Sequence, residues 1–120
     1  MCIRDSVMAF RQDALRLYDT LAASRPRRPV IVYGFSLGTA MATYVASQRK
    51  IAGLILAGTI ASAAEELPVY THAQGLPTET TATLVPAPDS IEAFNEVANI
   101  ARSTAPLLML HGEADTLVPM

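Results

Sequence analysis

The sequence predicts an α/β fold with a parallel sheet, and three observations carry that prediction. Two apolar runs, VIVY at 30–33 and IAGLILAG at 51–58, have the uniformly hydrophobic composition of strands that are covered on both faces. A stretch rich in small residues lies between them at 37–48, and an amphipathic stretch precedes them at 7–23. The order helix, strand, helix, strand is typical of βαβ units, whose strands run parallel.

The first helix is predicted over residues 7–23 by the spacing of its apolar side chains. One stripe, which we expect to be buried, is formed by residues that recur three or four positions apart: Val7, Phe10, Ala14, Leu17 and Leu21. The prolines of SRPRRP, residues 24–29, end this helix. The same segment is the only cationic cluster of the sequence, and we interpret it as a solvated turn before a strand.

The remaining elements complete a small three-layer arrangement. We place the three strands at about 30–34, 51–57 and 106–110, with helices on both faces of the sheet. The segment 59–89 contains several prolines and has no clean period, so we interpret it as a short cap-like excursion over the sheet. A last helix is expected from Asp89 to about Ala101, with Asp89 and Glu92 as a capping box.

The composition narrows the class of protein. The chain has 120 residues, 51% hydrophobic and 17% charged, with a formal charge of −2, as expected for one soluble domain. We therefore expect no nucleic-acid partner, and no apolar run approaches the ~20 residues of a membrane span. The single cysteine, Cys2, excludes an internal disulfide, and no metal or cofactor motif is found. No secretory signal is visible, so a cytoplasmic location is the default; the oligomeric state is left open.

The first six residues stand apart from this domain. Read back into codons, MCIRDS matches the transposase end sequence that is used in preparing sequencing libraries. We interpret residues 1–6 as adapter-derived and residues 7–120 as a partial domain whose natural start lies upstream. The nucleotide record tests this interpretation, because different codons would contradict it.

The segment GFSLG, residues 34–38, carries the main functional signal. Gly34, Ser36 and Gly38 form G-x-S-x-G directly after a predicted strand and at the start of a predicted helix. A sharp turn there would push the serine hydroxyl out at the edge of the sheet, and glycines two residues on either side would avoid collisions. The alternative is that Ser36 merely caps a helix in an ordinary α/β loop.

The sequence resembles the α/β-hydrolase superfamily at two motifs. VIVYGFSLGTAMATYVA resembles its strand, nucleophile elbow and following helix, and APLLMLHGEADTLVP resembles its later strand with the acid-bearing loop. With IAGLILAG between them, the resemblance extends from about residue 7 to the end and is greatest to the serine-aminopeptidase-like, esterase-like branch. It implies a partial α/β-hydrolase fold with Ser36 as the nucleophile, Leu37 as an oxyanion-hole N–H and Phe35 within the elbow.

The acid of the catalytic triad is expected in the loop HGEAD. The resemblance assigns it to Asp115, four residues after His111. The position also makes sense physically, because the carboxylate follows the carboxyl end of a buried strand, where α/β sheets place their sites. Glu113 is the local competitor, and a solvated loop acid is the alternative interpretation of Asp115.

Neither histidine of the sequence stands where the resemblance places the base of the catalytic triad. The family order is nucleophile, acid, histidine, whereas His72 and His111 both precede Asp115. We interpret His111 as structural and hydrogen-bonded in its loop, and His72 as a surface or substrate-facing residue. The base and the second oxyanion donor are therefore expected outside the printed sequence, and the 120 residues alone should lose on the order of 10⁴ in rate.

The resemblance implies a serine hydrolase that acts on a small ester, amide or peptide substrate. The excursion supplies apolar side chains that would suit an acyl pocket: Leu67, Val69, Tyr70, Leu76, Leu84 and Val85. Two alternatives stay open. One is a binding module in which the serine has no chemistry, and the other is an acyltransferase or haloperoxidase-like relative that uses the same elbow.

Overall fold

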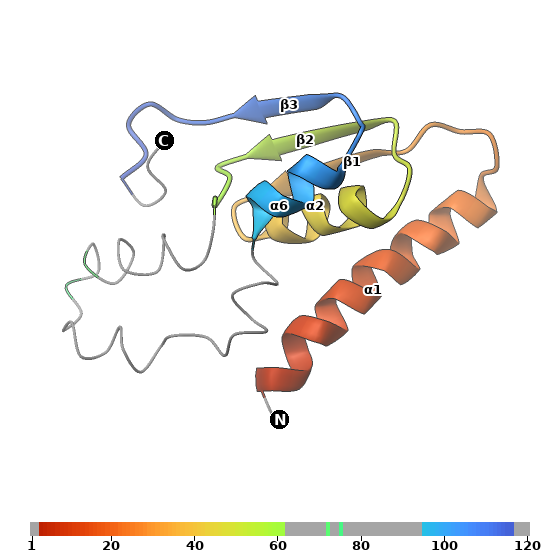
Figure 1. Ribbon diagram of the computed structural model, residues 1–120, viewed down its shortest axis with the longest axis horizontal. Helices are drawn as coiled ribbons and strands as arrows, with labels where there is room; N and C mark the ends of the chain where they lie inside the picture. Colours follow the sequence, from red (N-terminus) through yellow and green to blue (C-terminus); the bar gives the residue numbers. More distant parts are fainter. Residues whose placement is uncertain (1–2, 62–71, 73–74, 76–94, 117–120) are drawn as a thin grey trace.

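The computed structural model describes residues 3–61, 72, 75 and 95–116, and these form a three-stranded sheet with three helices. Figure 1 shows the elements in chain order. Their bounds are α1 Ile3–Ser24, β1 Ile31–Phe35, α2 Gly38–Gln48, β2 Gly53–Ala57, α6 Glu96–Arg102 and β3 Leu107–Leu110. The three strands lie within two residues of their predicted bounds.

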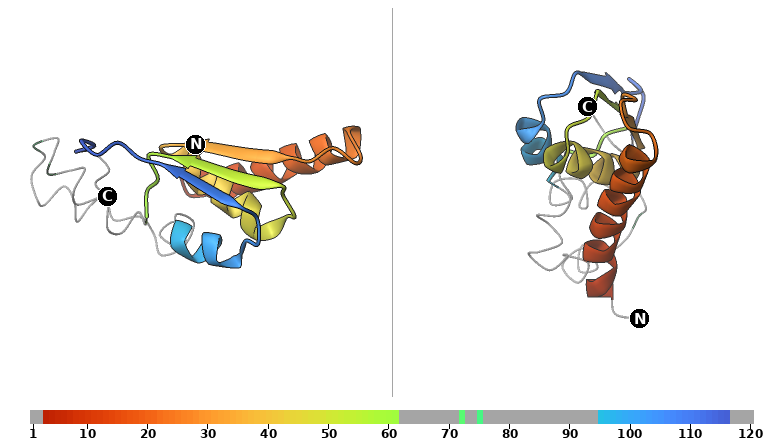
Figure 2. Two further views of the ribbon diagram at one scale, coloured as in Figure 1. Left: turned by 90° about the horizontal axis from the view of Figure 1, so that it is seen from above. Right: turned by 90° about the vertical axis from the view of Figure 1, so that its right-hand side faces the viewer.

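The sheet is parallel, as predicted, with the strand order β1-β2-β3. Phe35 pairs with Ala57, and Ala57 pairs with Leu110, so the three strands end side by side at one edge of the sheet. The chain always adds the next strand on the same side. Because crossovers between parallel strands are right-handed, α2 and α6 then lie on the same face of the sheet. Figure 2 shows these two helices below the strands, with α1 beside α2.

The two faces of the sheet differ in burial. Gly34, Leu54 and Leu56 point toward α2 and are buried, and Leu56 is completely inaccessible. On the opposite face, Tyr33 and Phe35 are 61% and 66% exposed. We expected helices on both faces; among the described residues that expectation is met on one face. The reason is topological, since a sheet that grows in one direction does not send a crossover helix to its other side.

A small apolar core lies between α2 and the sheet. It consists of buried residues from α2 and β2 together with Ile51: Ala42, Val45, Ala46, Ile51, Leu54 and Leu56. The small side chains of α2 allow this helix to lie close to the strands, which accounts for the alanine-rich composition noted in the sequence.

The buried side of α1 is not the predicted stripe. Phe10 and Leu17 are each 64% exposed, and Leu21 is also exposed, whereas Leu15 and Tyr18 pack against the core. Of the stripe residues whose burial the structure describes, Ala14 packs against the core. The helix contacts α2, and Leu17 and Leu21 line an open hollow of about 260 Å³ beside β1. The prediction was wrong because periodicity locates an apolar face but does not say which neighbour the helix packs against.

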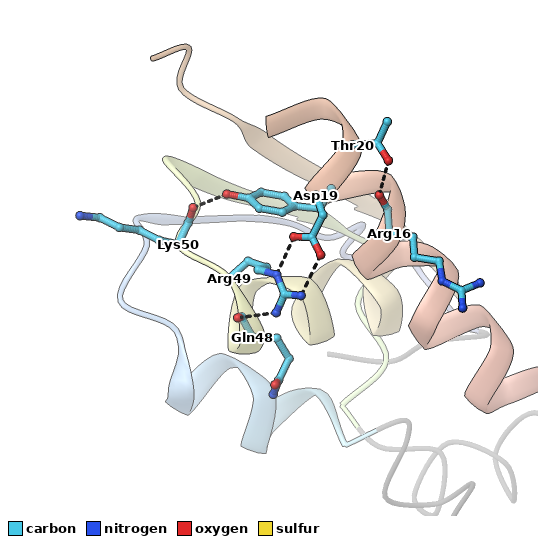
Figure 3. Close-up of polar contacts among 7 residues, drawn as sticks. Arg16, Asp19, Thr20, Gln48, Arg49 and Lys50 are labelled. Atoms are coloured by element: carbon cyan, nitrogen blue, oxygen red, sulfur yellow. Dashed lines mark hydrogen bonds and ion pairs between the residues drawn. The ribbon is translucent and has the colours of Figure 1, made fainter. Parts of the chain in front are cut away.

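Polar contacts fasten α1 to the loop after α2 (Figure 3). The Arg49 guanidinium donates to both carboxylate oxygens of Asp19, at 2.8 and 2.9 Å. These hydrogen bonds lower the pKa of Asp19 below its ordinary value. Tyr18 donates its hydroxyl to the carbonyl of Lys50 at 2.5 Å. Closer to the N-terminus of α1, the Arg11 guanidinium lies 4.3 Å from the centre of the Tyr44 ring of α2.

Replacing Tyr18 by phenylalanine should test how much this fastening contributes. The ring remains packed against the core, but the hydrogen bond to Lys50 is lost. We expect the free energy of unfolding to fall by about 1 kcal/mol, measured by urea denaturation. Tyr33→Phe is the matched control, because its side chain lies on the exposed face. Equal stability losses in the two variants would show that the Tyr18 hydroxyl has no special role.

The predicted second and last helices have different outcomes. α2 starts one residue after its predicted first residue and ends where expected. α6 begins at Glu96, and the side-chain oxygen of Asn95 caps it by accepting from the N–H of Ala98 at 3.0 Å. The predicted capping box of Asp89 and Glu92 lies outside the described residues, as does most of the excursion at 59–89. None of the described helices is both long and apolar enough to cross a membrane.

Candidate active site

Ser36 lies in a strained turn between β1 and α2. Its φ is +49°, a left-handed conformation that a residue with a side chain rarely adopts. The Ser36 N–H donates to the carbonyl of Ala57 at 2.9 Å, which ties the turn to the neighbouring strand. The residue is exposed at the carboxyl edge of the sheet. This is the strand–turn–helix arrangement that the sequence predicted for GFSLG.

Gly34 makes this turn sterically feasible. A Cβ atom at Gly34 would lie 2.7 Å from Thr39 Cα, 2.8 Å from Ala42 Cβ and 2.8 Å from the carbonyl oxygen of Gly38. Two of these three atoms belong to the backbone of α2, so neither can move away cheaply. Gly38 is different, because no described atom lies within 4 Å of a Cβ built there. We expected both glycines to avoid collisions, and steric crowding requires a glycine at Gly34 and not at Gly38.

The first turn of α2 directs backbone N–H groups toward the same edge. Leu37 is the N-cap residue, and the N–H of Thr39 donates to the Ser36 carbonyl at 2.9 Å. Among the described residues, the Leu37 N–H has no hydrogen-bond acceptor. A free donor beside Ser36 at the positive end of a helix could stabilise a negatively charged oxygen. Phe35, the other elbow residue, has its side chain on the open face of the sheet.

Asp115 lies in the loop after β3, at the same edge of the sheet as Ser36. Its N–H donates to the Gly112 carbonyl at 3.0 Å, which closes a tight turn. Its carboxylate Oδ2 lies 3.9 Å from Nε2 of His111, an ion-pair distance when the imidazole is protonated. The structure thus brings Asp115 and His111 together, both partly buried, whereas the competing carboxylate of Glu113 is exposed.

The two histidines do not take the position of a base beside Ser36 in the sheet. Because Phe35, Ala57 and Leu110 are in register, His111 follows a strand that is two positions away from the one before Ser36. Two strand spacings correspond to roughly 10 Å between the backbones. His72 is exposed, and its carbonyl accepts from the N–H of Gly75 at 3.0 Å. The apolar cap residues from Leu67 to Val85 lie outside the described residues.

A buried carboxyl lies on the inner side of the elbow. Glu96 of α6 is 1% exposed, and Thr39 of α2 is fully buried. The Thr39 hydroxyl oxygen lies 2.7 Å from Glu96 Oε1 and 2.5 Å from the carbonyl oxygen of Ser36. One threonine hydroxyl thus connects the carboxyl to the backbone of the serine.

Burial controls the charge of Glu96. Removal from water raises its pKa to about 7, and the hydrogen bond from Thr39 lowers it by a smaller amount. Among the described residues, neither Oε2 of Glu96 nor Nδ2 of Asn99 has a hydrogen-bond partner. Glu96 cannot be recognised from the sequence, because a glutamate in the first turn of a helix is ordinarily a solvated residue that complements the helix dipole.

The fold and the elbow together define a class: an α/β protein that presents a strained serine at the carboxyl edge of a parallel sheet. The family model described as "Serine aminopeptidase, S33" matches residues 3–96, which include Ser36 and its elbow. The chain therefore belongs to the serine aminopeptidase S33 family, within the α/β hydrolases, and its resemblance to that branch is confirmed. Neither a curated protein nor a solved structure matches the chain.

Proposed function

We propose that this α/β hydrolase cleaves an ester or amide bond through an acyl-enzyme on Ser36. The single observation that carries the proposal is the positive φ of Ser36, +49°, in an exposed turn between a strand and a helix. A strained backbone costs stability, so it persists only where the surrounding structure enforces it, and such sites are often functional. Family membership supports hydrolysis as the class of reaction.

The proposed reaction has two halves. The Ser36 oxygen attacks the carbonyl carbon while a histidine base takes its proton, and that proton then goes to the leaving alcohol or amine as the C–O or C–N bond breaks. Water attacks the acyl-enzyme in the same way and restores the free hydroxyl. The Leu37 N–H would donate to the oxyanion in each half, and Asp115 would orient the histidine.

The base is assigned to a histidine that follows Asp115 in the family order, rather than to His111. This assignment rests on the resemblance and on the position of His111 two strands away from β1. On this proposal, the 120 residues alone should react more slowly than the full-length protein by a factor on the order of 10⁴.

Labelling with a fluorophosphonate probe tests the proposal. The full-length protein should gain one probe mass on the peptide that contains Ser36, and Ser36→Ala should abolish the labelling. Ser47→Ala is the matched control, because that hydroxyl lies within α2, away from the elbow, and donates to the carbonyl of Tyr44 at 2.7 Å. Labelling that survives in Ser36→Ala, or no labelling of the unmodified protein, would contradict the proposal and favour a binding module.

The acceptor of the acyl group needs a separate measurement. The acyl-enzyme is expected to transfer to water, so hydrolysis of a short-chain p-nitrophenyl ester should give mainly the free acid even when a competing alcohol is present. Predominant formation of a new ester would instead favour the acyltransferase alternative, with the same nucleophile.

A further inference from the structure

Thr39 connects the backbone of Ser36 to a buried carboxyl that the hydrolytic mechanism leaves unused. It is the second residue of α2, and its hydroxyl oxygen is within hydrogen-bond distance of both the Ser36 carbonyl and Glu96 Oε1, at 2.5 and 2.7 Å. Both Thr39 and Glu96 are shielded from water. The contact spans 57 positions in the sequence, so it fastens α6 to the elbow from inside the domain.

The number of hydrogen atoms available for these two contacts determines which protonation state of Glu96 fits them. A threonine hydroxyl has one hydrogen to donate, and both of its neighbours here are oxygens. If Glu96 is ionised, both neighbours are pure acceptors, and one of the two short O···O contacts lacks a hydrogen. If Glu96 carries a proton, its O–H donates to Thr39 Oγ1, and Thr39 donates to the Ser36 carbonyl. The protonated carboxyl is the form that satisfies both distances.

We propose that Glu96 is a positioning residue for Ser36, acting through Thr39 and doing so as the neutral acid. An effect on catalysis rests on the proposed function, in which Ser36 is the nucleophile. Glu96 itself does not touch the reacting atoms. Ionisation of Glu96 would draw the Thr39 hydrogen toward the carboxylate. The Ser36 carbonyl would then keep its bond from the Thr39 N–H, at 2.9 Å, and lose the second one. The elbow should therefore change its conformation or mobility when Glu96 titrates.

The surroundings of Glu96 are compatible with a neutral carboxyl. Three charged or titratable groups, Arg11 of α1, Tyr44 of α2 and Arg102 of α6, line a polar groove on these helices together with Asn95 and Asn99. None of them is among the causes of the pKa shift, which are burial and the hydrogen bond with Thr39. Since burial dominates and raises the pKa to about 7, Glu96 changes its charge near neutral pH.

The direct test follows the backbone amides of Ser36 and Leu37 by NMR over about pH 5 to 9. In the unmodified protein, both amide shifts should titrate with a midpoint near the pKa of Glu96. Glu96→Gln should remove this step and hold the elbow amides near their low-pH positions, because the glutamine amide donates to Thr39 at every pH. Only a step that disappears in Glu96→Gln belongs to Glu96.

Variants at Thr39 test whether the elbow responds to the ionisation of Glu96 through the Thr39 hydroxyl. Thr39→Val keeps the shape but removes the hydroxyl, so the elbow amides should no longer respond to Glu96. Thr39→Ser keeps the hydroxyl and should restore the response. A step that persists unchanged in Glu96→Gln or in Thr39→Val would overturn the proposal, as would the absence of any step in the unmodified protein. Far-UV circular dichroism establishes that each variant is folded.

The pH profile of Ser36 labelling supplies the functional readout. The labelling rate of Glu96→Gln relative to the unmodified protein should rise by about 2- to 10-fold between acidic and alkaline pH, as expected for one positioning hydrogen bond. A pH-independent ratio would contradict the positioning role. If the amides titrate as described but Ser36 is never labelled, the proposed function fails while the coupling between Glu96 and the elbow is supported.

Discussion

Gly34→Ala is expected to destabilise the protein by about 3 kcal/mol, near the upper end for an overpacked core position. The new methyl group would lie 2.7 Å from Thr39 Cα and 2.8 Å from the carbonyl oxygen of Gly38. Since both atoms belong to the backbone of α2, the strand and the helix would have to separate, and the turn that holds Ser36 would open. Urea denaturation followed by circular dichroism measures the loss as a lower midpoint.

Gly38→Ala is the matched control for this experiment. It adds the same methyl group four residues later, where no described atom lies within 4 Å and the φ is not positive. Gly38 is the first residue of α2, so alanine should leave the stability unchanged or raise it by up to about 1 kcal/mol. Equal midpoints for the two variants would contradict the view that close packing against α2, rather than the G-x-S-x-G pattern as such, requires a glycine.

Glu96→Gln is expected to remove a pH dependence of stability. A folded-state pKa raised from 4.5 to about 7 means that the folded protein binds more protons than the unfolded chain in this range. Stability due to this group is therefore fully present below about pH 4.5 and is lost as the pH rises to about 7. The shift corresponds to about 3 kcal/mol. The variant should gain about this much relative to the unmodified protein between pH 4.5 and pH 8.

The measurement is the urea midpoint of both proteins across that pH range. Glu113→Gln is the matched control, because it removes an exposed carboxyl and should leave the difference profile flat. Asp19, whose pKa is lowered by its hydrogen bonds with Arg49, acts in the opposite direction, and its contribution is lost only as the pH falls toward 4 and below. A flat difference in stability between Glu96→Gln and the unmodified protein across this pH range would contradict the prediction, because it would mean that Glu96 ionises at no unusual cost.

Much of the architecture followed from local patterns. The apolar runs located β1, β2 and β3 within two residues, and the small-residue stretch located α2. The strained turn was also predictable, because a glycine two residues before a serine at a strand–helix junction removes the side chain that would collide with the following helix. The left-handed backbone of Ser36 is a property of about five consecutive residues, and such short-range geometry can be read from sequence.

The tertiary structure decided which faces are buried and what lies beneath the elbow. Periodicity grouped Phe10, Leu17 and Leu21 on one side of α1, but the helix packs through Leu15 and Tyr18, because its neighbour α2 lies there. Glu96 had every sequence feature of a solvated acid. In the folded protein it is buried and hydrogen-bonded to Thr39, which is 57 positions away in the sequence. A sequence by itself determines local backbone geometry, whereas the dielectric environment of a side chain is set by residues that only folding brings near it.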